Sequence, residues 1–175
     1  GVAGHDFMKL DSVALKNAVP TAEGAVAEAV FDSPVQIQGS RCLVTGFGRC
    51  GSVLAEKLKL WSAKVTAAAR NKEQRALAES FGIKAVSLDE LKEELSQADF
   101  IFNTIPAMIL DRERLEQVKK EALIVDIASA PGGVDFMAAD ELGIKAKQCL
   151  GIPGKYAACS AAAILTETMI TEWDV

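Results

Sequence analysis

A chain of 175 residues with a net charge of −5, half of it hydrophobic and a quarter charged, has the composition of one globular domain. No apolar run approaches the length of a membrane span, nothing at the start resembles a signal peptide, and the acidic balance argues against a nucleic-acid-binding surface. A single histidine, His5, and four cysteines without a C-x-x-C pair argue against a metal site. We therefore expect a cytoplasmic protein with free thiols and with no membrane, nucleic-acid or metal partner.

The first part of the chain differs in character from the rest. Residues 1–18 show no clear period and are predicted to be a leader or linker, so the domain would cover residues 19–175. A helix is predicted over Pro20–Phe31, because proline suits a first helical turn and Asp32-Ser33-Pro34 would end it. This helix would precede the first strand of the domain.

Short strand-like runs then alternate with helix-like runs. The strands are predicted at Cys42–Thr45, Val65–Ala69, Ala85–Val86, Phe100–Asn103, Leu123–Ile127 and Ile144–Lys147. The helices are predicted at Ser52–Trp61, Lys72–Phe81, Leu88–Leu95, Asp111–Val118 and Phe136–Leu142, with a last helix at Ala157–Glu172. Strands that are apolar on both faces are typical of a parallel sheet covered by helices. The pattern predicts an α/β fold, a doubly wound parallel six-stranded sheet of order 3-2-1-4-5-6 with an extra N-terminal helix.

A G-x-G-x-x-G motif, Gly46-Phe47-Gly48-Arg49-Cys50-Gly51, follows the first predicted strand. Gly46 allows the tight turn, Gly48 lets the backbone approach a pyrophosphate, and Gly51 lets the next helix pack against the sheet. The helix N-terminus would offer free N–H groups to the phosphates. Cys50 is either a reactive thiol of lowered pKa or, as its size favours, a small packing residue. The motif in this place predicts a Rossmann dinucleotide-binding site rather than an empty glycine-rich turn.

The end of the second predicted strand bears on the choice between NAD and NADP. An acid about 20 residues past the loop would bind the ribose hydroxyls of NAD. Arg70 stands there instead, 19 positions after Gly51. Its guanidinium would pair with a 2′-phosphate, to which Asn71 could donate and Lys72 could add charge, while Arg49 could reach either phosphate group. The sequence therefore favours NADP, with NAD as the alternative.

Three further loops are expected at the carboxyl ends of strands four, five and six, facing the nicotinamide. The cofactor-binding candidates there are Asn103 and Thr104, which would orient the ribose, and Ile105, Pro106 and Ala128. The substrate candidates are Ser129, Gly132, Gly133 and Lys155. Lys155, the only ammonium in these loops, is also the one catalytic candidate. A turn or cap role remains an alternative for each polar residue.

Groups that could move a proton beside a hydride are scarce. Asp126 is expected to end its strand and to bond to nearby backbone, and no histidine–carboxylate pair is evident. The sequence therefore supports cofactor binding more strongly than catalysis.

Six segments together resemble the dinucleotide-binding domain of the A subunit family of dipicolinate synthase. They are Val19–Gly24, Gly46–Gly51, Val65–Arg70, Phe102–Ala107, Asp126–Gly133 and Gly151–Lys155. The glycine loop alone is generic, whereas the combination of P-T-A-E-G, N-T-I-P-A and G-I-P-G-K is specific. The chain departs from the family's pattern at Ser129-Ala130-Pro131, where a lysine is expected before the proline, and at Ala157-Ala158-Cys159, where a proline is expected.

The resemblance implies an NADP- or NAD-dependent oxidoreductase that oxidises a dihydrodipicolinate-like dicarboxylate to dipicolinate during spore formation. It also implies a second, flavoprotein-like B subunit as partner. By position, Lys155 would face the substrate, and the cofactor would be held by Gly46, Gly48, Arg49, Gly51, Arg70, Asn103, Thr104 and Pro106. The family carries a further N-terminal domain of comparable size, which has no counterpart in these residues.

Two other hypotheses stay open. The cofactor domain of a D-2-hydroxyacid or shikimate-type dehydrogenase would share the fold, but no Arg-Glu-His or Lys-Asp set is evident. A non-catalytic NAD(P)-sensing or assembly module would account for the alanine-rich helices at 21–31 and 157–169, which could bind a partner. We expect a homo-oligomer.

Overall fold

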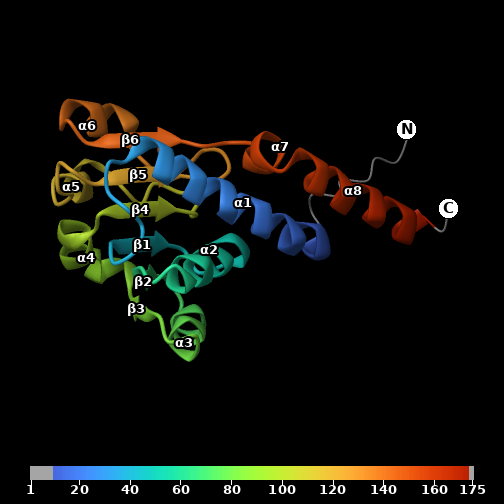
Figure 1. Ribbon diagram of the computed structural model, residues 1–175. Helices are drawn as coiled ribbons and strands as arrows, with labels where there is room; N and C mark the ends of the chain where they lie inside the picture. Colours follow the sequence, from blue (N-terminus) through green and yellow to red (C-terminus); the bar gives the residue numbers. More distant parts are fainter. Residues whose placement is uncertain (1–9, 174–175) are drawn as a thin grey trace.

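The computed structural model describes residues 10–173 and contains one sheet of six strands in the order β3-β2-β1-β4-β5-β6 (Figure 1). All neighbouring strands are parallel. The strands are β1 (Arg41–Thr45), β2 (Lys64–Ala68), β3 (Lys84–Val86), β4 (Phe100–Asn103), β5 (Leu123–Asp126) and β6 (Lys145–Gln148). The predicted doubly wound order is confirmed, and every strand lies within one residue of its predicted bounds.

Helices cover both faces of the sheet. One face carries α1 (Asp11–Asp32), α2 (Arg49–Leu60) and α3 (Lys72–Ser80). The other face carries the 3₁₀ helix η2 (Leu88–Glu90), α4 (Leu91–Gln97), α5 (Arg112–Leu115) and α6 (Phe136–Glu141). After β6 come α7 (Ile152–Tyr156) and α8 (Ala158–Trp173), which extends beyond the sheet beside the start of α1 (Figure 1). None of the helices in the described part of the chain is long and apolar enough to cross a membrane.

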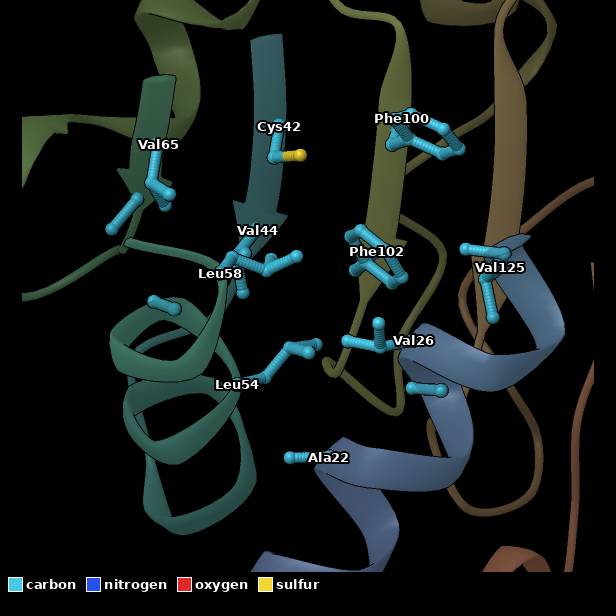
Figure 2. Packing of buried hydrophobic residues seen from close by; sticks show 14 of the residues in the cluster. Ala22, Val26, Cys42, Val44, Leu54, Leu58, Val65, Phe100, Phe102 and Val125 are labelled. Atoms are coloured by element: carbon cyan, nitrogen blue, oxygen red, sulfur yellow. The ribbon is translucent and has the colours of Figure 1, made fainter. Parts of the chain in front are cut away.

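The layer between the sheet and α1 and α2 is apolar. Figure 2 shows Leu54 and Leu58 of α2 and Val26 of α1 meeting over Val44 and Phe102 of the central strands. Burying each such leucine contributes about 1.5–3 kcal/mol. Alternate strand residues face the opposite layer, and among them are Leu43, Ile101 and Ile124. This is why the strands are apolar on both sides.

Helix α1 confirms the extra N-terminal helix, but its predicted start was wrong. The helix begins at Asp11, so residues 11–18, which the sequence assigned to a leader, are helical and Pro20 lies inside the helix. Proline removes one backbone hydrogen bond from a helix interior. Buried alanines on both sides of Pro20 pack against the body of the domain, and this tertiary packing keeps the helix continuous. The predicted leader residues 1–9, with His5, lie outside the described residues.

Candidate functional site

A cleft of about 830 Å³ runs along the carboxyl ends of the strands. Parallel strands bring their following loops to this one edge, where doubly wound sheets bind ligands. The loops after β1, β2, β4, β5 and β6 all contribute, and α1 adds a further wall. Among the residues lining the cleft are Ala14, Asn17, Thr21, Gly46–Gly51, Arg70, Asn71, Thr104–Ala107, Ile127–Ser129 and Cys149–Pro153.

The three loop glycines have different reasons for being glycine. Gly46 has a φ of +93°, and a Cβ there would collide with Thr104 Oγ1. A Cβ on Gly51 would collide with the carbonyl oxygen of Gly46. At Gly48, by contrast, φ is −86° and an added Cβ would meet no protein atom within 4 Å. The bare backbone of Gly48 therefore borders the open cleft, which fits the close approach of a pyrophosphate.

Helix α2 starts beside this backbone. Gly48 is its N-cap and supplies no side-chain cap, so N–H groups of the first turn remain available to an anion. Arg49 lines the cleft, and its Nη1 lies 2.5 Å from Asp11 Oδ1 of α1. Burial raises the pKa of the Cys50 thiol, with Arg49 and Thr21 opposing this less strongly. This direction is opposite to the lowered pKa of a reactive thiol and agrees with the alternative of a small packing residue.

The turn after β2 holds a cation at the edge of the cleft. Arg70 is exposed, and its guanidinium has no ion-pair partner among residues 10–171, whose side chains the structure describes. Nη1 of Arg75 donates to the carbonyl oxygens of Ala69 and Arg70, each at 2.8 Å. Asn71 caps α3 by accepting from the Gln74 N–H at 2.8 Å. The backbone of this turn is thus fixed while the Arg70 guanidinium is left for an anion. Sequence reasoning missed Arg75, because only the folded turn shows which carbonyls it meets.

Asn103 is fully buried and does not line the cleft. Its Oδ1 accepts from Thr45 Oγ1 at 2.6 Å, and its Nδ2 donates to Asp126 Oδ1 at 2.8 Å. Asp126 in turn accepts from the N–H groups of Ala128 and Gly133, each at 3.0 Å. The predicted backbone-bonding role of Asp126 is confirmed. The network joins the ends of β1, β4 and β5 and shapes the loops that border the cleft.

Some of the remaining candidates line the cleft, and others pack behind the loops that border it. Thr104, Ile105, Pro106, Ala128 and Ser129 line the cleft. Gly132 and Gly133 do not, and a Cβ on Gly133 would collide with the Asn103 amide. These two glycines therefore pack against the side chains of Asp126 and Asn103, which hold the loops in place.

Lys155 is likewise not among the residues that line the cleft. Its Nζ is 2.5 Å from Glu28 Oε1 and 5.0 Å from the centre of the Tyr156 ring. Lys147 Nζ of β6 also lies 2.5 Å from Glu28, at Oε2. Burial acts to raise the pKa of Glu28, but the hydrogen bonds from the two lysines outweigh it and lower the pKa to about 2. Glu28 therefore ties β6 and α7 to α1 as an ionised group.

Glu28→Gln is expected to lower stability near neutral pH by about 1–3 kcal/mol, because a charged acceptor for two lysines is lost. Since the folded-state pKa of about 2 lies below the ordinary 4.5, the ionised carboxylate stabilises the fold above pH 4.5. That contribution is lost as the pH falls from 4.5 toward 2. Thermal unfolding of both proteins across this range should show melting temperatures that converge at low pH.

A constant difference in melting temperature over the same range would contradict the low pKa of Glu28. The matched control is Glu141→Gln, which breaks an ion pair with Arg112 whose side chains are 54% and 58% exposed. Exposed pairs contribute about 0–1 kcal/mol, so this control should change the melting temperature little.

The glycine loop, the strand order and the cleft agree with what comparison finds. The model of the family described as D-isomer specific 2-hydroxyacid dehydrogenase, NAD binding domain, matches residues 14–134. The chain belongs to this family. Family membership assigns it a nicotinamide dinucleotide as cofactor and places it among the NAD-binding domains of dehydrogenases.

Within this family, the chain is similar to the A subunit of dipicolinate synthase. It is 37% identical to the Bacillus subtilis (strain 168) protein over 91% of this chain and 54% of that protein. A crystal structure of the Bacillus subtilis A chain matches with a TM-score of 0.95 and 35% identity, covering 97% of this chain and 57% of that one. The structure of the corresponding Bacillus halodurans protein gives 0.93 and 33%, with 95% and 57% covered. The chain thus spans little more than half the length of these relatives.

Proposed function

We propose that this chain is the NADP(H)-binding part of an oxidoreductase of the same type as the A subunit of dipicolinate synthase. The observation that carries the proposal is Arg70, a cation at the end of β2 that lines the cleft and has no ion-pair partner within the described side chains of residues 10–171. An acid in this place would bind ribose hydroxyls and repel a 2′-phosphate, whereas a guanidinium pairs with the phosphate. The Asn71 side-chain N–H₂ is also available, because the helix cap uses only its oxygen.

The similarity to dipicolinate synthase supports a planar dicarboxylate as substrate, a dihydrodipicolinate-like compound oxidised to dipicolinate in spore formation. Becoming aromatic requires such a ring to lose a hydride and a proton, and bound NADP⁺ would supply the hydride acceptor. Ile105 and Pro106 would form an apolar wall that excludes water, and the Ser129 hydroxyl would donate to a substrate carboxylate. The Bacillus subtilis relative is named as one subunit of its synthase, which supports a B subunit as partner.

Isothermal titration of the chain with NADPH and with NADH tests the proposal. We expect both to bind, and NADPH to bind at least about tenfold more tightly, since a charge-assisted contact contributes about 1.5–3 kcal/mol. Gly48→Ala should weaken both cofactors about 10- to 100-fold, because the methyl group enters the space of the pyrophosphate. Absence of binding by the unmutated chain would overturn the proposal.

Gly154→Ala is the matched control for the Gly48 variant. Gly154 also has no protein atom within 4 Å of an added Cβ, but it does not line the cleft. This variant should bind both cofactors as the unmutated chain does. Equal losses in the two variants would show a general effect of added methyl groups and would contradict the role given to Gly48.

One observation favours a second function, that of an NAD(P)-sensing or assembly module. In the described part of the chain, no carboxylate, histidine or lysine lines the cleft, so none of these proton-transfer groups borders it. A module of this kind would bind NADPH without turning over any dicarboxylate. An assay with NADP⁺ and a dihydrodipicolinate-like dicarboxylate separates the two functions. It is run with the chain alone and then with the flavoprotein-like partner. A rise in NADPH absorbance supports the oxidoreductase, and no rise in either case supports the module.

A further inference from the structure

Helix α1 presents a polar side chain to the cofactor cleft where an apolar one would suit the fold. Ala14, Asn17 and Thr21 lie three and four residues apart on one side of the helix, and all three line the cleft. Asn17 is 9% exposed, and its Oδ1 is buried without a hydrogen-bond partner. Across residues 10–171, the part of the chain with described side chains, it is the one buried side-chain N or O atom that lacks a partner.

The fold by itself gives no reason for asparagine at this position. Asparagine is a weak helix former, and a buried polar group without a partner costs free energy that an apolar residue of the same shape would not. The neighbouring buried residues of α1, Val13 and Ala18, are apolar. The next polar residue on this side differs, because Thr21 Oγ1 is satisfied within the helix by donating to the Asn17 carbonyl oxygen at 2.7 Å. The unpartnered oxygen of Asn17 therefore indicates that its hydrogen-bond donor belongs to a ligand rather than to the protein.

The position of α1 identifies which part of a dinucleotide lies nearby. The proposed function puts the pyrophosphate at Gly48, after β1, and the 2′-phosphate at Arg70, after β2. The nicotinamide riboside then extends to the other side of β1, toward the loops after β4, β5 and β6. Helix α1 packs between α2, which starts at the glycine loop, and α7, which follows β6. Asn17 thus belongs to the nicotinamide end of the cleft.

The chemistry of the oxygen restricts the ligand group. A carbonyl oxygen accepts hydrogen bonds, so an ionised dicarboxylate, which carries only acceptors on its carboxylates, cannot satisfy it. The nicotinamide riboside offers donors in its two ribose hydroxyls and its carboxamide N–H₂. Because the terminal torsion of asparagine is broad, the amide can turn its oxygen toward such a donor.

We propose that Asn17 is a cofactor-binding residue whose side-chain oxygen accepts a hydrogen bond from the nicotinamide riboside half of the bound dinucleotide. The proposal rests on the proposed function, since it needs a dinucleotide in the cleft. Helix α1 then has a second role besides covering the sheet, because the same helix that anchors β6 and α7 through Glu28 also contacts the reactive end of the cofactor.

Asn17→Leu tests the proposal, because leucine has nearly the shape of asparagine and lacks the oxygen. Calorimetric titration of the variant and the unmutated chain would use NADPH, 2′-phospho-ADP-ribose, which lacks the nicotinamide, and adenosine 2′,5′-bisphosphate, which lacks the whole riboside. We expect about tenfold weaker NADPH binding and unchanged binding of the bisphosphate. Weakened 2′-phospho-ADP-ribose binding would assign the donor to the ribose, and unchanged binding would assign it to the carboxamide.

Stability without cofactor provides a second readout. If the Asn17 oxygen has a hydrogen-bond partner only when the cofactor is bound, Asn17→Leu should raise the melting temperature of the cofactor-free chain by about 2–4 °C, since the unsatisfied acceptor is removed. A lower melting temperature would overturn the proposal by showing that the amide stabilises the fold. Unchanged NADPH affinity, or an equal loss for the bisphosphate, would also overturn it. If the unmutated chain binds no dinucleotide, the proposed function falls with it, whereas NADPH binding that Asn17→Leu leaves intact removes only this inference.

Discussion

Replacing Arg70 with alanine is expected to lower the affinity for NADPH about 10- to 150-fold and to leave the affinity for NADH nearly unchanged. The expectation follows from the position of the guanidinium, which lines the cleft at the end of β2 and pairs with none of the carboxylates described between residues 10 and 171. Only NADPH carries the 2′-phosphate with which that guanidinium would pair. Titration calorimetry with both cofactors measures the selectivity directly, and salt should weaken the NADPH contact because the pair is exposed.

Lys72→Ala is the matched control for Arg70→Ala. The two variants lose the same charge two residues apart, but Lys72 does not line the cleft. Its removal should change NADPH affinity little. Comparable losses in both variants would mean that a diffuse positive field, rather than a contact from Arg70, favours NADPH. Equal effects of Arg70→Ala on NADPH and NADH would remove the argument for NADP and leave the dinucleotide fold in place.

Gly24→Ala is expected to destabilise the protein by about 2–3 kcal/mol and to lower its melting temperature by about 4–12 °C. Alanine normally stabilises a helix interior relative to glycine by about 1 kcal/mol, so the predicted sign is the reverse of the helix propensity. The reason is contact with α7: an added Cβ would collide with Ile152 Cγ2 and would lie 2.8 Å from Tyr156 Cδ2. Thermal unfolding of the cofactor-free variant measures the effect.

A double-mutant cycle can attribute that loss to the α1–α7 contact. Ile152→Ala removes the Cγ2 atom that a Cβ on Gly24 would meet. The double variant should therefore lose less stability than the sum of the two single losses, because the collision is relieved. Additive losses, or a stabilising Gly24→Ala, would contradict the close packing of the two helices. Because Ile152 also lines the cleft, the single Gly24 variant should weaken cofactor binding as well.

Part of the candidate site could be predicted from the sequence, because the patterns that indicate it extend over only a few neighbouring residues. The glycine spacing after an apolar run, and Arg70 at the end of the next run, place the loop and the cation without knowledge of the fold, and both line the cleft. Apolar runs separated by turn residues likewise predict the strands, since a buried parallel strand must be apolar on both faces. Residues that touch only near neighbours in sequence are the ones that such patterns describe.

Other residues acquired their roles through contacts between distant segments. The sequence predicts Asn103 as a ribose ligand because it ends a strand. In the fold, its amide oxygen accepts from Thr45 and its amide nitrogen donates to Asp126, both at neighbouring strand ends. The sequence predicts Lys155 as a substrate group because it is the only ammonium in the three loops after β4, β5 and β6. In the fold it donates a hydrogen bond to Glu28, 127 residues earlier. Neither partner could be read from the local pattern.

The sequence by itself determined the six-stranded doubly wound sheet, the glycine loop and the cation that follows β2, because strand burial, turn chemistry and spacing act over a few residues. Only the tertiary structure decided how helix α1 serves the site. Its start at Asp11 and its passage through Pro20 depend on packing rather than on propensity. The unpartnered oxygen of Asn17, the tight contact at Gly24 and the lysines around Glu28 arise where this helix meets segments that are remote in the chain, and sequence distance carries no record of such contacts.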